Sequence, residues 1–350
     1  RVSPPSSTSA AVRSDPSRTP LPSPRGNARR PRRSAPRRGE VLLEEVGEVM
    51  RDDDTSGLVG GPVNRYGGKG RTARHITPHF APATIYAEPF FGAGSVFYSL
   101  APGLYERAAV NDLDASLVTF FRVLRDRTDE LVAACEFTPY AREEFIACLA
   151  KSDDPLEEAR RVWVRGRQGL AGNARTAGDW GRNVGADTTK WNPKQANNKL
   201  AALRTYAARL RGVCIDCVDG VEFVEKWGQV TTFVYCDCPY VAASRKGESY
   251  AHEMTDADHR RLAAACHGAV ERGAKVAVSG YHSDLYRELF AGWRTIEVDV
   301  PLYGARDTKG QRRTEVLWMS YPAAESFAGI EAAKRNARQP SLFDLGGGAK

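Results

Sequence analysis

The segment Thr84-Ile85-Tyr86-Ala87-Glu88-Pro89-Phe90-Phe91-Gly92-Ala93-Gly94-Ser95 decides the fold of this chain. Its first residues, 84–87, have the composition of a short strand, and residues 96–100 continue like the start of a helix. A glycine-rich turn between a strand and a helix lets a ligand approach the backbone at the carboxyl edge of a sheet. A dinucleotide site would show a third glycine, and Phe97 stands at that position. The turn alone is compatible with a plain tight turn as well as with a nucleotide site.

Strand-like and helix-like runs alternate after this segment. Further strands are predicted at residues 108–110, 213–218, 231–235 and 275–279, near 294–300 and near 314–320. Further helices are predicted at residues 116–124 and about 256–272. This alternation is typical of an α/β fold, in which a mostly parallel sheet carries helices on both faces. A basic segment at 138–200, rich in Gly and Asn and containing Trp, interrupts the alternation.

The positive charge of the chain is concentrated near its amino terminus. The 350 residues carry a formal net charge of +7, and residues 1–40 contain ten Arg, no Lys and two acids. The remainder is therefore close to neutral, so bulk charge is no evidence for nucleic-acid binding. Residues 1–60 are predicted to be a disordered Arg/Pro/Ser-rich tail. An arm that binds phosphates is one interpretation of it, and composition favours a solvated or upstream-translated segment instead.

Nothing in the composition indicates a membrane protein or a secreted one. The sequence has no apolar run of about 18 residues or more and no signal-peptide pattern. Seven cysteines in a mid-sized chain favour free thiols in a reducing compartment over a disulfide framework. We expect a cytoplasmic protein, and a monomer.

Asp112 follows the second predicted strand. An acidic residue there can accept hydrogen bonds from ribose hydroxyls, although a helix N-cap or turn is the better interpretation of this residue alone. Together with the glycine-rich turn, it favours a cofactor that contains adenosine.

The tetrapeptide Asp237-Cys238-Pro239-Tyr240 follows another predicted strand and fits a catalytic role. An aromatic amine is a poor nucleophile, because its lone pair is delocalised into the ring. Hydrogen bonds to the amine protons draw that lone pair out of conjugation, and the Asp237 carboxylate and the Cys238 carbonyl can accept them. Pro239 fixes the turn, and Tyr240 offers a face on which an extruded base can stack. By itself the pattern is equally compatible with an ordinary Asp-x-Pro turn.

The order of these motifs resembles the Dam-like, alpha group of DNA N6-adenine methyltransferases, in the form found in phages and mobile elements. The resemblance covers about residues 63–320 and includes two further stretches, Ser279-Gly280-Tyr281 and Arg313-Thr314-Glu315-Val316-Leu317. Four motifs carry it: Arg65-Tyr66-Gly67-Gly68-Lys69, residues 88–95, Asn111-Asp112 and Asp237-Cys238-Pro239-Tyr240. One departure is Cys238, which stands where the family usually has Pro; the backbone carbonyl survives this change.

The resemblance implies a class I methyltransferase fold with S-adenosyl-L-methionine as cofactor, and methylation of the N6 amine of adenine in double-stranded DNA of a bacterial or phage-infected cell. The cofactor-binding residues that it implies are Arg65, Tyr66, Lys69, Glu88, Pro89, Phe90, Gly92, Gly94, Asp112 and Asp237. The implied domain division is a catalytic domain at 61–137 and 201–325, a target-recognition insert at 138–200, and a flexible tail at 326–350.

Basic side chains and tryptophans mix in residues 160–200, which predicts a DNA-contacting patch within the insert. The alternative is a solvated face with core tryptophans. The strongest candidates for DNA binding are Arg165, Arg167, Gln168, Asn173 and Arg175.

Metal binding is not predicted. Cys214 with Cys217, and Cys236 with Cys238, have irregular spacing for zinc, so ordinary strand and turn cysteines are favoured. His259 lies too far from His252 to form a zinc-binding helix motif.

Other functions remain open at this stage. Cytosine N4 methylation uses the same chemistry, RNA is a less favoured substrate, and a DNA-binding decoy with weak catalysis would keep the fold alone. The intact Asp237, Pro239 and Tyr240 argue against the decoy. The recognition sequence and a partner restriction enzyme are not visible.

The carboxyl-terminal stretch Gln339-Pro340-Ser341-Leu342-Phe343 resembles the peptide by which bacterial replication proteins bind the sliding clamp. In that mode Leu342 and Phe343 fill an apolar pocket and Gln339 bonds at its edge. The alternative, which we favour slightly, is that Leu342 and Phe343 fold back onto the catalytic domain.

Overall fold

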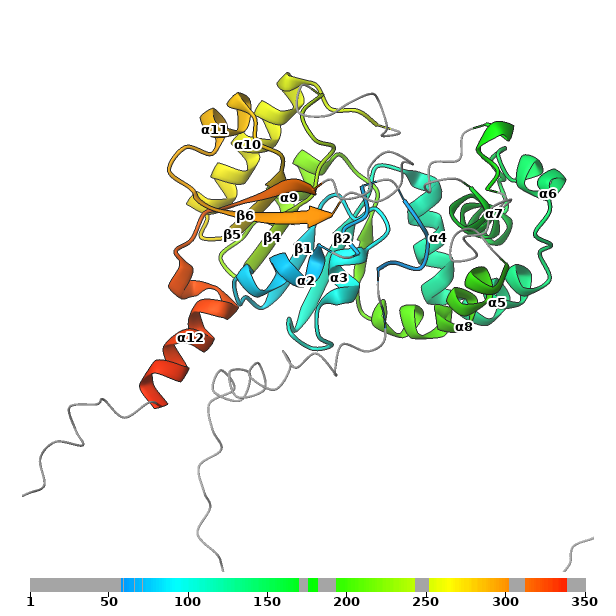
Figure 1. The fold of residues 1–350 in the computed structure, drawn as a ribbon, viewed down its shortest axis with the longest axis horizontal. Helices are drawn as coiled ribbons and strands as arrows, with labels where there is room; N and C mark the ends of the chain where they lie inside the picture. Colours follow the sequence, from blue (N-terminus) through cyan, green and yellow to red (C-terminus); the bar gives the residue numbers. More distant parts are fainter. Residues whose placement is uncertain are drawn as a thin grey trace, which may run out of the picture. The chain divides into compact units, whose positions relative to one another are not determined.

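The computed structural model describes residues 58–169, 176–181, 193–242, 252–301 and 312–338, apart from 59, 66 and 71. Within them lies a seven-stranded sheet of the order β3-β2-β1-β4-β5-β7-β6 (Figure 1). The strands are β1 (Ile85–Glu88), β2 (Arg107–Asn111), β3 (Cys214–Asp216), β4 (Thr232–Cys236), β5 (Lys275–Gly280), β6 (Arg294–Pro301) and β7 (Arg312–Met319).

The strand order reverses at the centre of the sheet. β1 pairs in parallel with β2 on one side and with β4 on the other. β3 and β5 extend this parallel part, whereas β7 runs antiparallel to both β5 and β6. In open α/β sheets, ligands bind in the crevice at the carboxyl ends of the strands beside such a reversal. Here that crevice follows Glu88 of β1 and Cys236 of β4.

Both faces of the sheet are apolar. Neighbouring residues of a strand point to opposite faces, so Tyr86 and Phe233 join one apolar cluster while Ala87 and Val234 join another. Such a sheet requires helices on both faces. Helices of the first cluster are α2 (Ala73–Ile76), α3 (Ser95–Ser99), α4 (Ala115–Asp126), α5 (Thr128–Glu136), α6 (Arg142–Ala147), α7 (Pro155–Gln168), α8 (Pro193–Arg209) and α12 (Phe327–Arg338). Those of the second are α9 (Gly220–Trp227), α10 (Asp256–Glu271) and α11 (Asp284–Leu289).

Helix α7 connects the predicted insert to the rest of the domain. It packs along α4 and α5, and its Trp163 is buried. At Gly166 an added Cβ would lie 3.1 Å from the Cβ of Val63, and the neighbouring Arg167 donates to the carbonyl of Pro62. The helix therefore holds the loop that leads to Lys69.

The predicted α/β fold is confirmed. Each predicted strand and helix has a counterpart whose ends differ by no more than two residues, and the sheet is mostly parallel with helices on both faces. Helices α2, α5 to α9, α11 and α12 were not predicted. No helix of the described ranges is long and apolar enough to cross a membrane.

Within the segment 326–350, which the sequence predicts to be a tail, residues 327–338 form helix α12. Phe327 is buried, and its N–H donates to the carbonyl of Phe80 at 2.9 Å. Of the predicted tail at 1–60, the description covers only Leu58, which is buried, and Gly60.

Candidate active site

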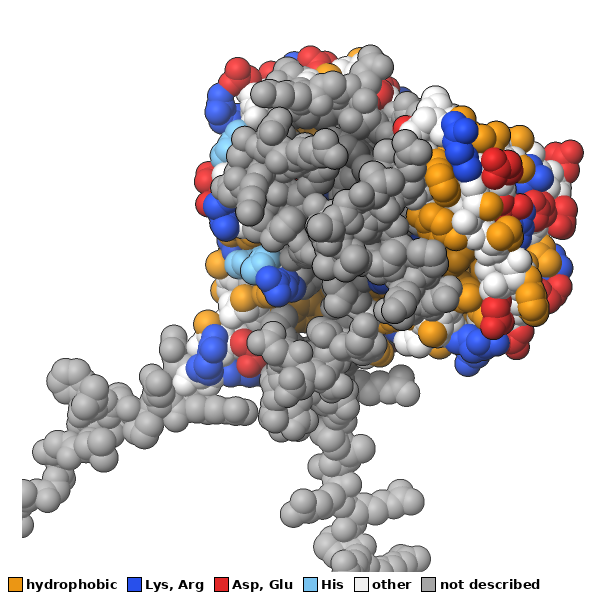
Figure 2. Space-filling model, turned by 45° about the vertical axis from the view of Figure 1, so that its right-hand side comes forward, with side chains coloured by type: hydrophobic (Ala, Val, Ile, Leu, Met, Phe, Trp, Pro, Cys, Tyr) orange, Lys and Arg blue, Asp and Glu red, His pale blue; other side chains and the backbone are white. Residues whose placement is uncertain are grey.

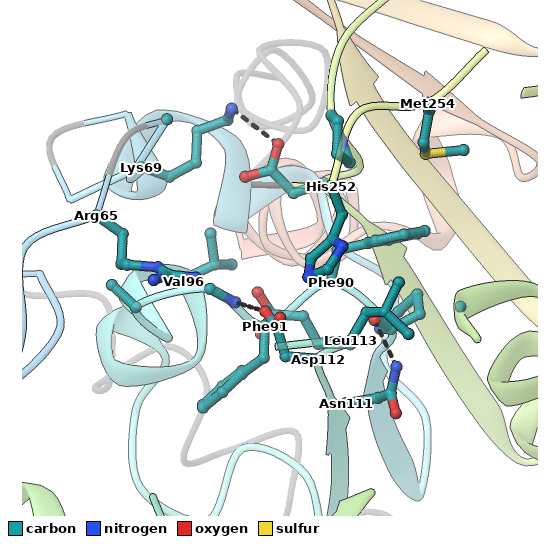
Figure 3. Close-up of a pocket in the computed structure, with 18 of the residues that line it drawn as sticks. Arg65, Lys69, Phe90, Phe91, Val96, Asn111, Asp112, Leu113, His252 and Met254 are labelled. Atoms are coloured by element: carbon teal, nitrogen blue, oxygen red, sulfur yellow. Dashed lines mark hydrogen bonds and ion pairs between the residues drawn. The ribbon is translucent and has the colours of Figure 1, made fainter. Parts of the chain in front are cut away.

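A cavity of about 280 Å³ lies at the carboxyl ends of β1 and β4 (Figure 3). Its lining includes eight of the ten residues that the sequence predicts to bind the cofactor: Arg65, Lys69, Glu88, Pro89, Phe90, Gly92, Asp112 and Asp237. Gly94 shapes the turn beneath it, and Tyr66 lies outside the described residues. Residues distant in the sequence thus meet where the strand order reverses.

The glycine-rich turn depends on both of its glycines. Gly92 and Gly94 have φ angles of 51° and 71°, in the left-handed region that side chains disfavour. A Cβ on Gly94 would also lie 2.6 Å from the ring of Phe91. The turn is fixed further by the N–H of Phe91, which donates to the carbonyl of Asn111 at 2.8 Å. Its backbone therefore borders the cavity closely, without side chains in between.

Asp112 holds the turn from the neighbouring strand. Its carboxylate accepts from the N–H of Gly92 at 2.8 Å and from that of Asp114 at 2.9 Å. Burial raises its pKa, although these backbone donors and the charge of Arg65 oppose the shift. The alternative role as a helix N-cap belongs to Asp114, which accepts from two N–H groups of α4 and pairs with Arg65 at 2.7 Å.

Asn111 joins two loops of the cavity, a role that the sequence analysis missed. Its buried amide donates to the carbonyls of Pro89 and Val218, each at 3.0 Å. Its Oδ1 accepts from the N–H of Val218 at 2.9 Å. One side chain therefore ties the turn after β1 to the loop after β3.

Glu88 ends β1 as a fully buried carboxyl group. Tyr86 donates to it at 2.8 Å. Burial raises the pKa of Glu88 well above its ordinary value, although the bond from Tyr86 opposes this. The group therefore favours its neutral form more strongly than an exposed glutamate does.

Asp237 belongs to a compact polar cluster with Lys69, Tyr240, Glu315 and Ser279. Lys69 Nζ lies 2.9 Å from Asp237 Oδ1 and 3.5 Å from Glu315 Oε2. Ser279 donates to the same Oδ1 at 2.9 Å, and the Tyr240 hydroxyl lies 3.2 Å from it. Tyr240 also bonds to Lys69 and, at 2.7 Å, to Glu315 Oε2. Among the described groups, the donors to Asp237 thus converge on Oδ1, and Oδ2 has none.

The ring of Tyr240 is covered in this structure. Lys69 Nζ lies 4.6 Å from the ring centroid, and Tyr281 contacts it edge-on at 4.5 Å. Only 3% of Tyr240 is exposed. The predicted stacking of a base on this ring therefore requires these neighbours to move.

Cys238 points away from the cavity. Its thiol lies 3.0 Å from the Tyr286 hydroxyl, which in turn lies 3.1 Å from His259 Nδ1. Burial raises the pKa of Cys238 to about 12, so the thiol stays neutral. Within the described ranges, His, Cys, Asp and Glu form no cluster that could hold a metal ion.

The candidate DNA contacts that are described face inward. Arg165 pairs with Glu158 at 2.9 Å. Arg167 and Gln168 are buried, and Gln168 donates to the carbonyl of Pro139 at 2.9 Å. These contacts favour a structural role for Arg167 and Gln168 over the predicted DNA contact.

Several predicted residues lie outside the described ranges. They are Asn173 and Arg175 of the insert, and Gln339, Leu342 and Phe343 of the carboxyl terminus.

Further cavity residues were not predicted. Asp219 and Val221 follow β3, and His252, Met254 and Arg261 come from the start of α10 and the segment before it. Only Asp219 carried a signal, as an acid shortly after a predicted strand. The others could not be recognised, since their positions depend on how α9 and α10 pack.

Comparisons with known proteins identify the family of this chain. The family model of the D12 class N6 adenine-specific DNA methyltransferases matches residues 66–300. The type II methyltransferase M1.LlaDCHI of Lactococcus lactis subsp. cremoris is 27% identical over 273 residues, which cover 73% of this chain and 93% of that protein. The DNA adenine methylase of Escherichia coli K12 is 27% identical over 64% of this chain and 81% of its own length. That of Vibrio cholerae serotype O1, strain ATCC 39541, is 27% identical over 72% and 92%. With its sheet order, its cavity and a family match across two thirds of its length, this chain belongs to the D12 class of N6 adenine-specific DNA methyltransferases.

Proposed function

We propose that the chain binds S-adenosylmethionine in the cavity beside β1 and β4, and that Asp237 activates the N6 amine of an adenine extruded from double-stranded DNA. The reaction itself follows from the family, which methylates adenine N6 in DNA. The observation that carries the assignment of the site is the geometry of Asp237: its Oδ1 is held by Lys69 and Ser279, it lines the cavity, and its Oδ2 has no donor among the described residues.

The residues of the cavity suit the chemistry of this cofactor. The backbone of the glycine-rich turn borders it closely, and Asp112 is a hydrogen-bond acceptor for ribose hydroxyls. Phe90, Leu113 and Val221 offer apolar surfaces for an adenine ring. The volume is near the lower end for small-molecule sites, which span roughly 300–1,000 Å³. When bound, the cofactor supplies an electrophilic methyl group on a sulfonium centre.

Asp237 and the backbone carbonyl of Cys238 would accept the two N6 protons. These hydrogen bonds localise the nitrogen lone pair and so make the amine nucleophilic. A carboxylate also stabilises the positive charge that develops on N6 as the methyl–sulfur bond breaks and the methyl–nitrogen bond forms, and preorganised charge of this kind is often the largest catalytic contribution. The surplus N6 proton would then leave through the Asp237 carboxylate that accepts its hydrogen bond. Because Oδ1 is fixed by its donors, the carboxylate does not need to reorient when the base arrives.

Target recognition is proposed for the insert at 138–200. The inward contacts of Arg165, Arg167 and Gln168 leave base and phosphate contacts to other residues of the insert, including the predicted Asn173 and Arg175. The described surface of this region mixes acidic, basic and apolar side chains on the face that Figure 2 shows. Recognition of DNA there would therefore depend on specific contacts from a few side chains and not on a broad basic surface.

Transfer of labelled methyl groups tests this function. The purified full chain is mixed with tritiated S-adenosylmethionine and plasmid DNA, and the DNA is digested to nucleosides. We expect the label only in N6-methyl-2′-deoxyadenosine. Label in N4-methyl-2′-deoxycytidine would contradict the proposed base, and the absence of transfer would favour a DNA-binding decoy.

Binding to a sliding clamp through Gln339, Leu342 and Phe343 is a separate proposal that rests on the sequence motif alone. A tether of this kind would raise the local concentration of the enzyme on newly copied DNA. A fluorescent peptide of residues 335–348 should show increased polarisation with purified clamp, and a peptide with Leu342→Ala and Phe343→Ala should not. Equal signals from the two peptides would disprove it.

A further inference from the structure

Glu315 lies beside the proposed catalytic carboxylate, although the sequence analysis gave it no role. It belongs to β7, which runs antiparallel to β5. The first residues of β7 therefore reach the same edge of the sheet as the carboxyl ends of β4 and β5. Only 7% of Glu315 is exposed. A buried carboxylate at this edge requires partners, because an unpaired one would be strongly disfavoured.

The partners of Glu315 are the same groups that hold Asp237. Its Oε2 accepts from the Tyr240 hydroxyl at 2.7 Å and lies 3.5 Å from Lys69 Nζ. Tyr240 and Lys69 also contact Asp237 Oδ1, at 3.2 and 2.9 Å. The two carboxylates thus share one hydroxyl and one ammonium group.

Sharing of the hydroxyl affects the acceptor strength of Asp237. A phenol has one proton to donate, and Glu315 is the nearer acceptor by 0.5 Å. Burial raises the pKa of Tyr240 well above its ordinary value, so the proton stays on the hydroxyl. Without the Glu315 carboxylate, Tyr240 would turn its proton to Asp237 and weaken the hydrogen bond from an incoming amine.

Sharing of the ammonium affects the charge near the reacting nitrogen. The described ionic groups of the cluster are Lys69, Asp237 and Glu315, one cation and two anions. Tyr235 and Ser279 complete the cluster as neutral groups, and burial likewise raises the pKa of Tyr235 well above its usual range. An excess of negative charge favours a transition state in which N6 becomes positive.

We propose that Glu315 is a positioning residue for methyl transfer: it accepts the hydrogen bond of the Tyr240 hydroxyl and shares the Lys69 ammonium, so that Asp237 remains a charged and oriented acceptor. This inference rests on the proposed role of Asp237. Glu315 itself is not among the described residues that line the cavity, so it acts through its neighbours and not on the substrate.

Single-turnover methyl transfer by the full chain, at saturating cofactor and DNA, tests the proposal. Glu315→Gln keeps the size of the side chain and removes its charge. We expect a first-turnover rate about 10- to 100-fold lower, with dissociation constants for cofactor and DNA within about threefold of the wild-type values. Glu315→Asp should retain part of the rate. It replaces Glu315→Gln as the test variant if thermal melting shows that Glu315→Gln is not folded. Glu297→Gln is the matched control, because this exposed residue of β6 pairs only with His282 among the described residues; it should transfer at the wild-type rate.

A double-mutant cycle distinguishes the effect of the shared charge from that of simple packing. Lys69→Met in the Glu315→Gln background restores the excess of one negative charge in the described cluster. If the two substitutions acted independently, the fold-losses in rate of the single variants would multiply. We expect the double variant to transfer methyl groups faster than that product predicts. A purely multiplicative loss, or a Glu315→Gln enzyme as fast as wild type, would overturn the proposal. Activity that persists in Asp237→Ala would instead refute the proposed function, whatever Glu315 does.

Discussion

Asp237 is the residue on which the proposed chemistry depends most directly. Asp237→Ala removes the acceptor for the N6 amine but leaves the turn, because the fold of the tetrapeptide comes from Pro239 and the buried Cys238. We expect a folded protein whose rate of methyl transfer is at least about 1,000-fold lower. Label incorporation and circular dichroism measure the two properties. Asp129→Ala is the control, since this exposed carboxylate pairs only with Arg204 in the described structure; equal activities of the two variants would exclude Asp237 from the site.

Asn111 supports the site by holding two loops in place, and it takes no part in the proposed reaction. Asn111→Ala would leave the carbonyls of Pro89 and Val218 without their donor, at a cost of about 1–3 kcal/mol in the free energy of unfolding. The glycine-rich turn should also lose definition, so cofactor affinity should fall. Urea unfolding and calorimetry with S-adenosylmethionine check both effects. Asn111→Asp, which keeps the acceptor for Val218 N–H but not the donors, should resemble the alanine variant; wild-type affinity in both would show that the turn does not need this tie.

Helix α7 shows how an element outside the sheet contributes to the site. Gly166 lies against Val63, so Gly166→Val would push away the loop that continues to Arg65 and Lys69. We expect a loss of about 1–3 kcal/mol in the free energy of unfolding and weaker cofactor binding. Gly268→Ala in α10 is the matched control: its added Cβ meets only the end of the Arg272 side chain, so better helix propensity should stabilise the protein by about 0.5–1 kcal/mol. Urea unfolding of both variants measures the difference, and a stabilised Gly166→Val protein would contradict the packing described.

The elements that could be predicted were those with a local signal. The runs at β1, β4 and β5 are apolar and bounded by turns, and their ends fell within two residues of the prediction. Helix α7 has local signals as well, an Asp154 N-cap, Pro155 at its first position and an apolar face. It was missed because its arginines were interpreted as part of a DNA-contacting patch. The residues that we propose to bind the cofactor were predicted from local motifs. Glu315 was not, since its contact with Tyr240 joins positions 75 residues apart, and only the antiparallel return of β7 brings them together.

At the scale of the whole molecule, the question is whether the Arg-rich residues 1–49 take part in methylation. The positive charge of the chain is concentrated there, and the rest is close to neutral. Contacts between such a segment and phosphates would be independent of sequence and would weaken steeply with salt. The family model matches residues 66–300, which lie outside this segment. Deletion of residues 1–49 should therefore leave the rate and the sequence specificity of methylation unchanged at moderate salt.

The salt dependence of this deletion variant distinguishes the two interpretations of the segment. If residues 1–49 only add phosphate contacts, the variant should bind DNA more weakly at low salt, and the slope of log K against log salt should become shallower by about 0.9 for each lost contact. Methylation rates and DNA affinities of the full chain and the variant, measured across a salt series, provide both quantities. A large loss of activity that persists at every salt concentration would mean that the segment makes specific contacts, because screening removes only the nonspecific ones.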